Sequence, residues 1–207
     1  MVLRLLLVRH GQTAYNAEAR FMGQLDIPLD ETGRRQAQAV AQRLAEERPA
    51  VIYSSNLKRA LETAAAVQTA IASHPDVRVD PRLIEGHFGD WQGETYEDLK
   101  VHDAARLARW ETGVLQVPPP NGESLQDLAE RVQAAYQDIC EAHPDQTVIV
   151  VAHGGTLQVL LVLALALPLE DYRKLWLSNA SVSELRVSET GATLHLLNET
   201  AYLSKAA

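Results

Sequence analysis

The sequence predicts an α/β protein: a three-layer α/β/α sandwich with a mostly parallel central sheet and a small cap insertion. Short apolar runs alternate along the chain with stretches of helical periodicity, which is typical of a parallel sheet covered by helices on both faces. The 207 residues show no fixed-period repeat and suit one domain, residues 1–207. Hydrophobic residues make up 46% and charged residues 22%, which are ordinary values for a globular chain and exclude a disordered one.

The first half of the chain alternates strands and helices. Residues 3–8 are apolar apart from Arg4, too continuously so for a half-exposed strand, which indicates a central parallel strand buried on both faces. Helical spacing begins at Thr32 and lasts until Pro49. A second short strand at residues 51–53 precedes a helical stretch at residues 60–71. Weaker strand candidates are residues 77–79 and 82–84, on either side of Pro81.

The second half repeats the alternation and ends in a hairpin. Ser124 opens a long helix whose apolar positions step by three and four residues up to Ile139. Residues 147–152 read as the clearest buried strand, and an apolar helix begins at Gly154. The final strands, predicted at 182–187 and 193–197, flank the turn residues 189–191.

Residues 86–122 depart from this alternation. They contain two short helical patterns around Leu99 and Leu107 and end in three consecutive prolines, 118–120. We expect this stretch to be a cap-like insertion within the single domain.

Composition also limits the partners and the location. The net charge of −8 disfavours a nucleic-acid partner, which requires a basic face. A single cysteine, Cys140, excludes an intramolecular disulfide and suits a reducing compartment. The most apolar run, residues 159–169, contains Pro168 and is too short to span a bilayer. The first apolar run is interrupted by Arg4 and lacks the features of a signal peptide, so we expect a cytoplasmic protein without membrane contact.

Charged and nucleophilic side chains follow the predicted strands. Arg9 and His10 come after the first strand, Arg59 opens the helix after the second, Glu85 follows residues 82–84, and His153 follows residues 147–152. The carboxyl ends of parallel strands meet at one edge of a sheet, where ligands bind. Arginine forks match phosphate oxygens, a neutral imidazole can attack phosphorus, and a carboxylic acid can protonate the departing oxygen. Each residue alone has an ordinary structural explanation, so the prediction of phosphoryl transfer depends on all five together.

Five blocks of sequence carry a family resemblance. Residues 9–16 read RHGQTAYN, residues 54–64 read SSNLKRALETA, residues 85–93 read EGHFGDWQG, residues 120–124 read PNGES, and residues 151–155 read VAHGG. In this order they resemble the histidine phosphatase superfamily, in the branch that contains the cofactor-dependent phosphoglycerate mutases.

The resemblance implies a role for each matching residue. His10 would become phosphorylated, while Arg9, Arg59 and His153 would surround the phosphoryl group. Glu85 would protonate the leaving group and then activate water. Substrate or phosphate contacts would come from Gln12, Thr13, Asn16, Met22, Gly23, Gln24 and Gly154. The resemblance implies no metal and no cofactor, and the sequence contains no metal-ligand motif.

Two departures from the family pattern bear on the activity. Met22 stands where many members have a polar side chain, so its contact would come from the backbone, with Gln24 as a substitute. The mutases carry a lysine after the acid and an adjacent arginine pair, whereas here Arg106 and Arg109 lie one helical turn apart. A mutase must hold a second anionic group on its substrate, so water is the favoured acceptor.

The favoured function is therefore a phosphomonoester hydrolase that acts through phosphohistidine on a small phosphorylated metabolite. The alternatives are a phosphoglycerate mutase, an α-ribazole phosphatase and, more remotely, an inactive phospholigand-binding protein. The apolar helix after Gly154 suits burial within one subunit or between two, which leaves a homodimer open.

Overall fold

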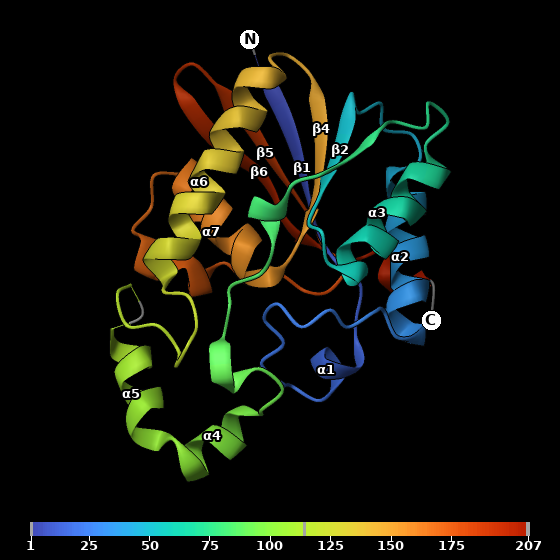
Figure 1. Ribbon diagram of the computed structural model, residues 1–207. Coiled ribbons are helices and arrows are strands. Elements are labelled where there is room, and N and C mark those ends of the chain that lie inside the picture. The colour runs from blue at the N-terminus through green and yellow to red at the C-terminus, as the bar shows by residue number, and fades with distance from the viewer. Residues whose placement is uncertain (1, 114, 206–207) are drawn as a thin grey trace.

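A six-stranded sheet forms the centre of the molecule in the computed structural model, which describes residues 2–113 and 115–205 (Figure 1). The strand order is β3-β2-β4-β1-β5-β6, and β3, β2, β4 and β1 run parallel. β5 pairs with β1 in the antiparallel direction and forms a hairpin with β6. The predicted fold class, with a mostly parallel sheet, is confirmed.

The strands and helices follow the predicted order closely. The strands are β1 (Leu3–Arg9), β2 (Val51–Ser54), β3 (Val77–Val79), β4 (Thr147–Ala152), β5 (Val182–Ser188) and β6 (Gly191–Glu199). The α-helices are α1 (Ala14–Ala17), α2 (Glu31–Leu44), α3 (Lys58–Ala70), α4 (Tyr96–His102), α5 (Ala104–Thr112), α6 (Leu125–Ala142) and α7 (Gly154–Ala164). Short 3₁₀ helices occur at Pro81–Leu83, Gly89–Trp91, Leu169–Lys174 and Leu203–Lys205.

Helices cover both faces of the sheet (Figure 1). Successive side chains of a strand point to opposite faces, so β1 contributes Leu5 and Leu7 to one core and Leu6 and Val8 to the other. The first core includes residues of α6 and α7, and the second includes residues of α2 and α3. Because both faces are buried, β1 and β4 are apolar at nearly every position.

Two helices that support the site begin at side-chain caps. Asp30 accepts a hydrogen bond from the backbone N–H of Gly33 (2.6 Å) at the start of α2. Ser124 and Asp127 form a reciprocal capping box at the start of α6. Each cap satisfies backbone donors that lack a partner in the first helical turn, a contribution of about 1 kcal/mol.

Residues 82–84 do not form a strand, and that prediction is wrong. Pro81 lacks a backbone N–H and has the fixed φ that suits the first position of a helix. The side chain of Asp80 accepts from the backbone N–H of Arg82 (2.9 Å). Together they favour the 3₁₀ helix Pro81–Leu83, which delivers the chain to Glu85.

Helices α4 and α5 lie apart from the two main cores and have an aromatic cluster of their own (Figure 1). Its buried members are Trp91, Leu99, Leu107 and Trp110. Phe21, from the loop after α1, packs against this cluster, with its ring centroid 6.1 Å from that of Trp110. Residues 86–122 are thus anchored to the loop that leads into the site.

The apolar character of α7 is explained within the subunit. Leu157, Val159, Leu160, Leu161 and Val162 are all buried in the core shared with α6. Within residues 2–113 and 115–205, no helix combines the length and the apolar character needed to cross a membrane.

Candidate active site

The predicted site residues meet at the carboxyl ends of β1 and β4. The two strands are adjacent and parallel, and Arg9 pairs in register with Ala152. His10 and His153 therefore leave the sheet side by side, with ring centroids 5.1 Å apart. Both imidazoles are buried, with 2% and 0% of their surface exposed.

The hydrogen bonds of His10 define its tautomer. Its Nδ1 lies 2.7 Å from the carbonyl oxygen of Gly11, which can only accept, so Nδ1 carries the proton. Nε2 is then unprotonated, and its lone pair accepts from the Nε–H of Arg59. Burial, followed by the charges of Arg59 and Arg9, holds the pKa of His10 well below its usual value. A neutral imidazole with an available Nε2 is the form that attacks phosphorus.

Arg59 is the central cation of the site. Its side chain is fully buried, and its two terminal nitrogens donate to the carbonyl oxygens of Gly23 (2.7 Å) and Leu25 (2.7 Å). Its Nε lies 3.3 Å from Nε2 of His10 and 3.2 Å from Nδ1 of His153, so one N–H is shared between both rings. Burial lowers the pKa of Arg59 to about 10, which still leaves it charged at neutral pH.

His153 is fixed in the opposite tautomer. Because its Nδ1 accepts from Arg59, its Nε2 carries the proton and donates to Oγ of Ser55 (2.8 Å). Burial and then the Arg59 charge hold the pKa of His153 well below its usual value. Ser55 appeared in a recognised sequence block, but its contact with His153 connects residues 98 positions apart and had no sequence signal.

Arg9 supplies a second guanidinium with unused hydrogen-bonding capacity. One terminal nitrogen donates to the carbonyl oxygen of Leu177 (2.6 Å). Its Nε is the one buried side-chain nitrogen or oxygen without a hydrogen-bond partner within residues 2–113 and 115–205. A buried, unpaired donor is costly unless a ligand satisfies it, and an anion would do so here.

Asn16 presents its amide nitrogen to the same space. Its Oδ1 accepts from the backbone N–H of Thr13 (3.1 Å), from the Thr13 hydroxyl (3.1 Å) and from Nδ2 of Asn179 (3.2 Å). With the oxygen occupied, Nδ2 of Asn16 is left as a donor beside the cavity. Asn179 also donates to the carbonyl oxygen of His10 (3.2 Å) and was missed in the sequence, because it lies far along the chain.

Glu85 reaches the site at the N-terminus of α7. Its carboxylate accepts from the backbone N–H groups of Gly155 (3.1 Å) and Thr156 (3.0 Å), where the helix dipole favours negative charge. A Cβ at position 155 would lie 2.8 Å from Oε1 of Glu85, so glycine there permits the approach.

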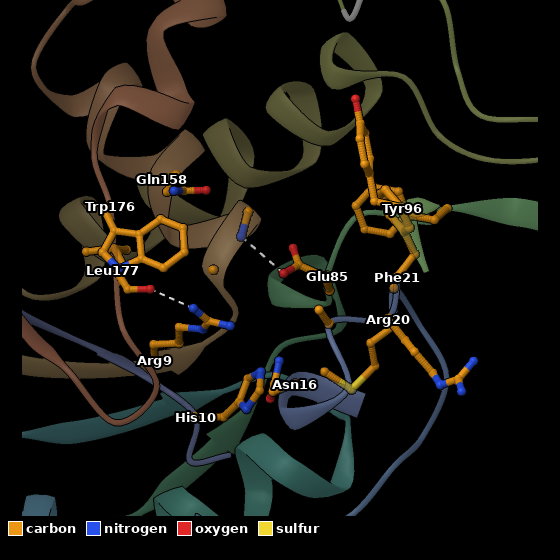
Figure 2. Close-up of a pocket in the computed structure, with 16 residues that line it drawn as sticks. Arg9, His10, Asn16, Arg20, Phe21, Glu85, Tyr96, Gln158, Trp176 and Leu177 are labelled. Carbon is orange, nitrogen blue, oxygen red and sulfur yellow. Dashed lines mark hydrogen bonds between the residues drawn. The ribbon is translucent and has the colours of Figure 1, made fainter. Parts of the chain in front are cut away.

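A cavity of about 460 Å³ opens between these groups. Figure 2 shows Arg9, His10, Asn16 and Glu85 around the same space, with Trp176, Tyr96 and Phe21 also on its wall. Of the predicted residues, those that line it are Arg9, His10, Asn16, Met22, Gly23, Glu85 and Gly154. Arg59 and His153 are fully buried, and both contact His10.

Three other predicted contacts have different partners. The Gln12 amide donates to Asp30 (3.0 Å), and Thr13 caps α1. Nε2 of Gln24 donates to the carbonyl oxygen of Glu85 (3.0 Å), which places it behind the acid. Met22 lines the cavity, and its sulfur lies 3.4 Å from the Thr13 hydroxyl oxygen.

The charged groups that meet here suit an anion. Two guanidinium groups flank two imidazoles, and a single carboxylate faces them. Within residues 2–113 and 115–205, no three His, Cys, Asp or Glu side chains are grouped so that they could hold a metal ion.

Comparison with known proteins identifies close relatives. The family model of the histidine phosphatase superfamily (branch 1) matches residues 5–200. Glucosyl-3-phosphoglycerate phosphatase of Mycolicibacterium vanbaalenii is 41% identical over 89% of this chain and 84% of its own. A metal-independent phosphoserine phosphatase of Arabidopsis thaliana is 40% identical over 77% and 67%. The crystal structure of a putative α-ribazole-5′-P phosphatase from Escherichia coli superposes with a TM-score of 0.88 at 30% identity, over 95% of this chain and 96% of the other.

Proposed function

Because the chain belongs to branch 1 of the histidine phosphatase superfamily, we propose that it hydrolyses small phosphomonoesters through a phosphohistidine at His10. The observation that carries this proposal is the Nε2 atom of His10, which is unprotonated and lies 3.3 Å from the Arg59 guanidinium. The attacking lone pair and the charge that stabilises the phosphoryl group are already in place.

In the first step, Nε2 of His10 attacks phosphorus in line, and the bond from phosphorus to the substrate oxygen breaks. Arg9 and Arg59 neutralise the charge of the equatorial oxygens, and the Asn16 amide donates a hydrogen bond to them. Glu85 transfers a proton to the departing oxygen, because an alkoxide is a poor leaving group. The Nδ1–H of His10 keeps its hydrogen bond to Gly11, which fixes the ring while Nε2 carries the phosphoryl group.

In the second step, water attacks the phosphohistidine from the side that the product alcohol has left. The Glu85 carboxylate takes the proton of this water, the bond from phosphorus to Nε2 breaks, and His10 returns to its neutral form. The products are an alcohol and inorganic phosphate. Glu85 gives up one proton in the first step and takes one up in the second, so no net proton is gained or lost by the protein.

The remaining cavity wall favours hydrolysis over mutase chemistry. Besides Arg9, the basic side chain on this wall is Arg20, whose guanidinium already donates to Glu18 (2.5 Å) and to the Gly93 carbonyl (2.7 Å). Arg106, which lies one helical turn from Arg109 and so departs from the adjacent arginine pair of the mutases, is paired with Asp103 at the start of α5. A free cation for a second anionic group of the substrate is therefore lacking on the described wall.

The second candidate function is an α-ribazole phosphatase. It is favoured by the superposition with the E. coli structure and by the aromatic residues Phe21, Phe88, Tyr96 and Trp176 on the wall, which suit a leaving group with a flat ring. An inactive phospholigand-binding protein is disfavoured, because each position that the chemistry requires is occupied by a competent side chain.

We further propose that residues 86–122 act as a cap over the leaving group and that catalysis needs no metal. We also propose that the protein works in the cytoplasm, without nucleic-acid or membrane partners. The excess of acids over bases supports the absence of a nucleic-acid partner. A homodimer stays a proposal that light scattering on the purified protein tests directly.

The direct test is a screen of phosphorylated metabolites that scores released phosphate, with and without a chelator. Hydrolysis that persists with the chelator supports the proposal, and failure to release phosphate from any phosphomonoester would overturn it. A second assay supplies 3-phosphoglycerate and its bisphosphate primer. Phosphate release in excess of 2-phosphoglycerate formation supports the hydrolase, whereas faster isomerisation would assign a mutase.

A further inference from the structure

Arg131 of α6 holds the segment of chain that carries Glu85. Its side chain is about four-fifths buried, with 19% of its surface exposed. One terminal nitrogen donates to the carbonyl oxygens of Arg82 (2.7 Å) and Ile84 (2.6 Å), and the other donates to that of Glu85 (3.0 Å). Three carbonyls within four residues are therefore fixed by one side chain that does not line the cavity.

Glu123 completes this arrangement at the point where residues 86–122 rejoin the domain. Its carboxylate oxygens accept from Nε (2.7 Å) and from a terminal nitrogen (2.8 Å) of Arg131, a bidentate pair. The same carboxylate accepts from the backbone N–H of His87 (3.2 Å), and the N–H of Glu123 donates to the His87 carbonyl (2.8 Å). The two ends of residues 86–122 thus meet at the Arg131–Glu123 pair.

We infer that the Arg131–Glu123 pair is a positioning device for the proton donor Glu85, an inference that rests on the proposed function. The carboxylate end of Glu85 is held by the N-terminus of α7, and its backbone end is held by Arg131. Because both its backbone and its carboxylate are held, Glu85 is kept in position to protonate the leaving oxygen. A displacement of about 1 Å at a reacting group costs on the order of 100-fold in rate, so loss of the backbone anchor is expected to weaken proton donation.

A purely structural role for Arg131 gives a different outcome. If the substitution only removed packing contacts of Arg131, it would lower the stability of the protein and reduce the hydrolysis of every ester alike. If it displaced Glu85, it would slow only the hydrolysis of esters whose leaving group needs the proton, namely those of basic alkoxides. The discriminating readout is therefore how steeply the rate falls as the leaving group becomes more basic.

The experiment measures kcat/KM for phosphate monoesters that range from p-nitrophenyl to alkyl phosphates, in Arg131→Ala, Arg131→Lys and Glu123→Gln. The matched control is Arg82→Ala, because Arg82 lies on the adjacent 3₁₀ helix and pairs with Asp80 (2.7 Å) and Asp138 (2.6 Å) on the outside of the same segment. Unfolding temperature and vanadate affinity are measured for each variant. They report whether the fold and the phosphate pocket are intact.

Arg131→Ala is expected to lose about 10- to 100-fold on alkyl phosphates and less than about 3-fold on p-nitrophenyl phosphate, because it weakens but does not remove the roughly 10²- to 10⁴-fold that a general acid supplies. Arg131→Lys should recover part of the loss, because lysine keeps the charge without the fork. Glu123→Gln, which retains the Arg131 side chain, should show a smaller loss of the same kind and covers the case in which Arg131→Ala does not fold. In Arg82→Ala, kcat/KM should depend on the basicity of the leaving group as it does in the wild type.

Equal losses on alkyl and aryl esters in the folded variants, or an unchanged dependence on the leaving group, would overturn the positioning role while leaving the phosphatase assignment intact. A wild-type protein that hydrolyses neither class of ester would instead overturn the proposed function, and the positioning role with it.

Discussion

The Nε atom of Arg59 lies 3.3 Å from the Nε2 atom of His10. In the resting site this N–H donates to the lone pair that would attack phosphorus. When a phosphoryl group arrives, the same N–H becomes available to its oxygens. The cation therefore adds to the effect of burial in keeping the imidazole neutral, and it lies beside the point where charge develops.

Arg59→Ala is expected to lower kcat/KM by about 10²- to 10³-fold for alkyl and aryl phosphates alike, because the equatorial charge must be neutralised whatever group leaves. Affinity for vanadate should fall in parallel, measured by inhibition or calorimetry. The matched control is Arg35→Ala on α2, which removes an exposed guanidinium paired with Glu31 and should leave kcat/KM unchanged. Losses confined to alkyl esters would contradict the role of Arg59.

Glu85→Gln is expected to show the opposite pattern. The amide keeps much of the shape but cannot donate a proton as an acid, so hydrolysis of alkyl phosphates should fall by about 10²- to 10⁴-fold. The first step on p-nitrophenyl phosphate should change little, since nitrophenolate leaves without a proton, and slow dephosphorylation should appear as a burst. Single-turnover rates check this. Equal losses on both esters would assign Glu85 a structural role.

The buried histidines predict a stability that depends on pH. The folded pKa values of His10 and His153 lie well below 6.5, whereas in the unfolded chain both titrate near that value. Below about pH 6.5 the unfolded chain therefore binds protons that the folded chain does not. The free energy of unfolding should fall as the pH drops from 6.5, by up to about 1.4 kcal/mol per pH unit for each histidine, with no contribution above that pH.

Denaturant unfolding at pH 7.5, 6.5 and 5.5 measures this dependence. His10→Asn removes one of the two groups, so its slope should be about half that of the wild type. His195→Gln, a change at an exposed position on β6, should retain the full slope. A His10→Asn slope equal to that of the wild type would contradict the account.

Trp176 is expected to contribute to the recognition of the leaving group. It is 67% exposed, lines the cavity and was not singled out in the sequence. Trp176→Ala should raise the KM for 2-phenylethyl phosphate by about 3- to 10-fold, the value of one aromatic contact, with little change for ethyl phosphate. Trp176→Phe should keep most of the affinity. Equal changes for both esters would show that Trp176 does not select the leaving group.

The sequence was sufficient to predict those site residues whose position is set by the end of a strand. His10 and His153 come directly after strands, Arg59 lies in the first turn of the helix after β2, and parallel pairing of the strands brings them together. The cores of α2, α3 and α6 were also predictable, because their apolar positions recur at helical spacing, and α7 was predicted from its nearly continuous apolar residues.

The residues that hold the site residues in place could not be predicted from strand ends or helical spacing. Ser55 contacts His153, and Asn179 contacts Asn16 and His10, through hydrogen bonds between residues far apart in the sequence, and no local pattern marks such contacts. Arg131 looked like one more polar position on an amphipathic helix, and only the folded chain brings it to the Glu85 carbonyl. The wrong strand at residues 82–84 has a local cause, since the Asp80 cap and Pro81 together favour a 3₁₀ turn over apolar β-propensity.

The central claim is that His10 carries the phosphoryl group, and trapping that intermediate tests it most directly. The protein is mixed with substrate, quenched in base and mapped by mass spectrometry. We expect one phosphate on His10, stable to base and labile to acid, and absent from His10→Ala. A phosphate on His153 or on a serine, or hydrolysis that persists in His10→Ala, would contradict the account.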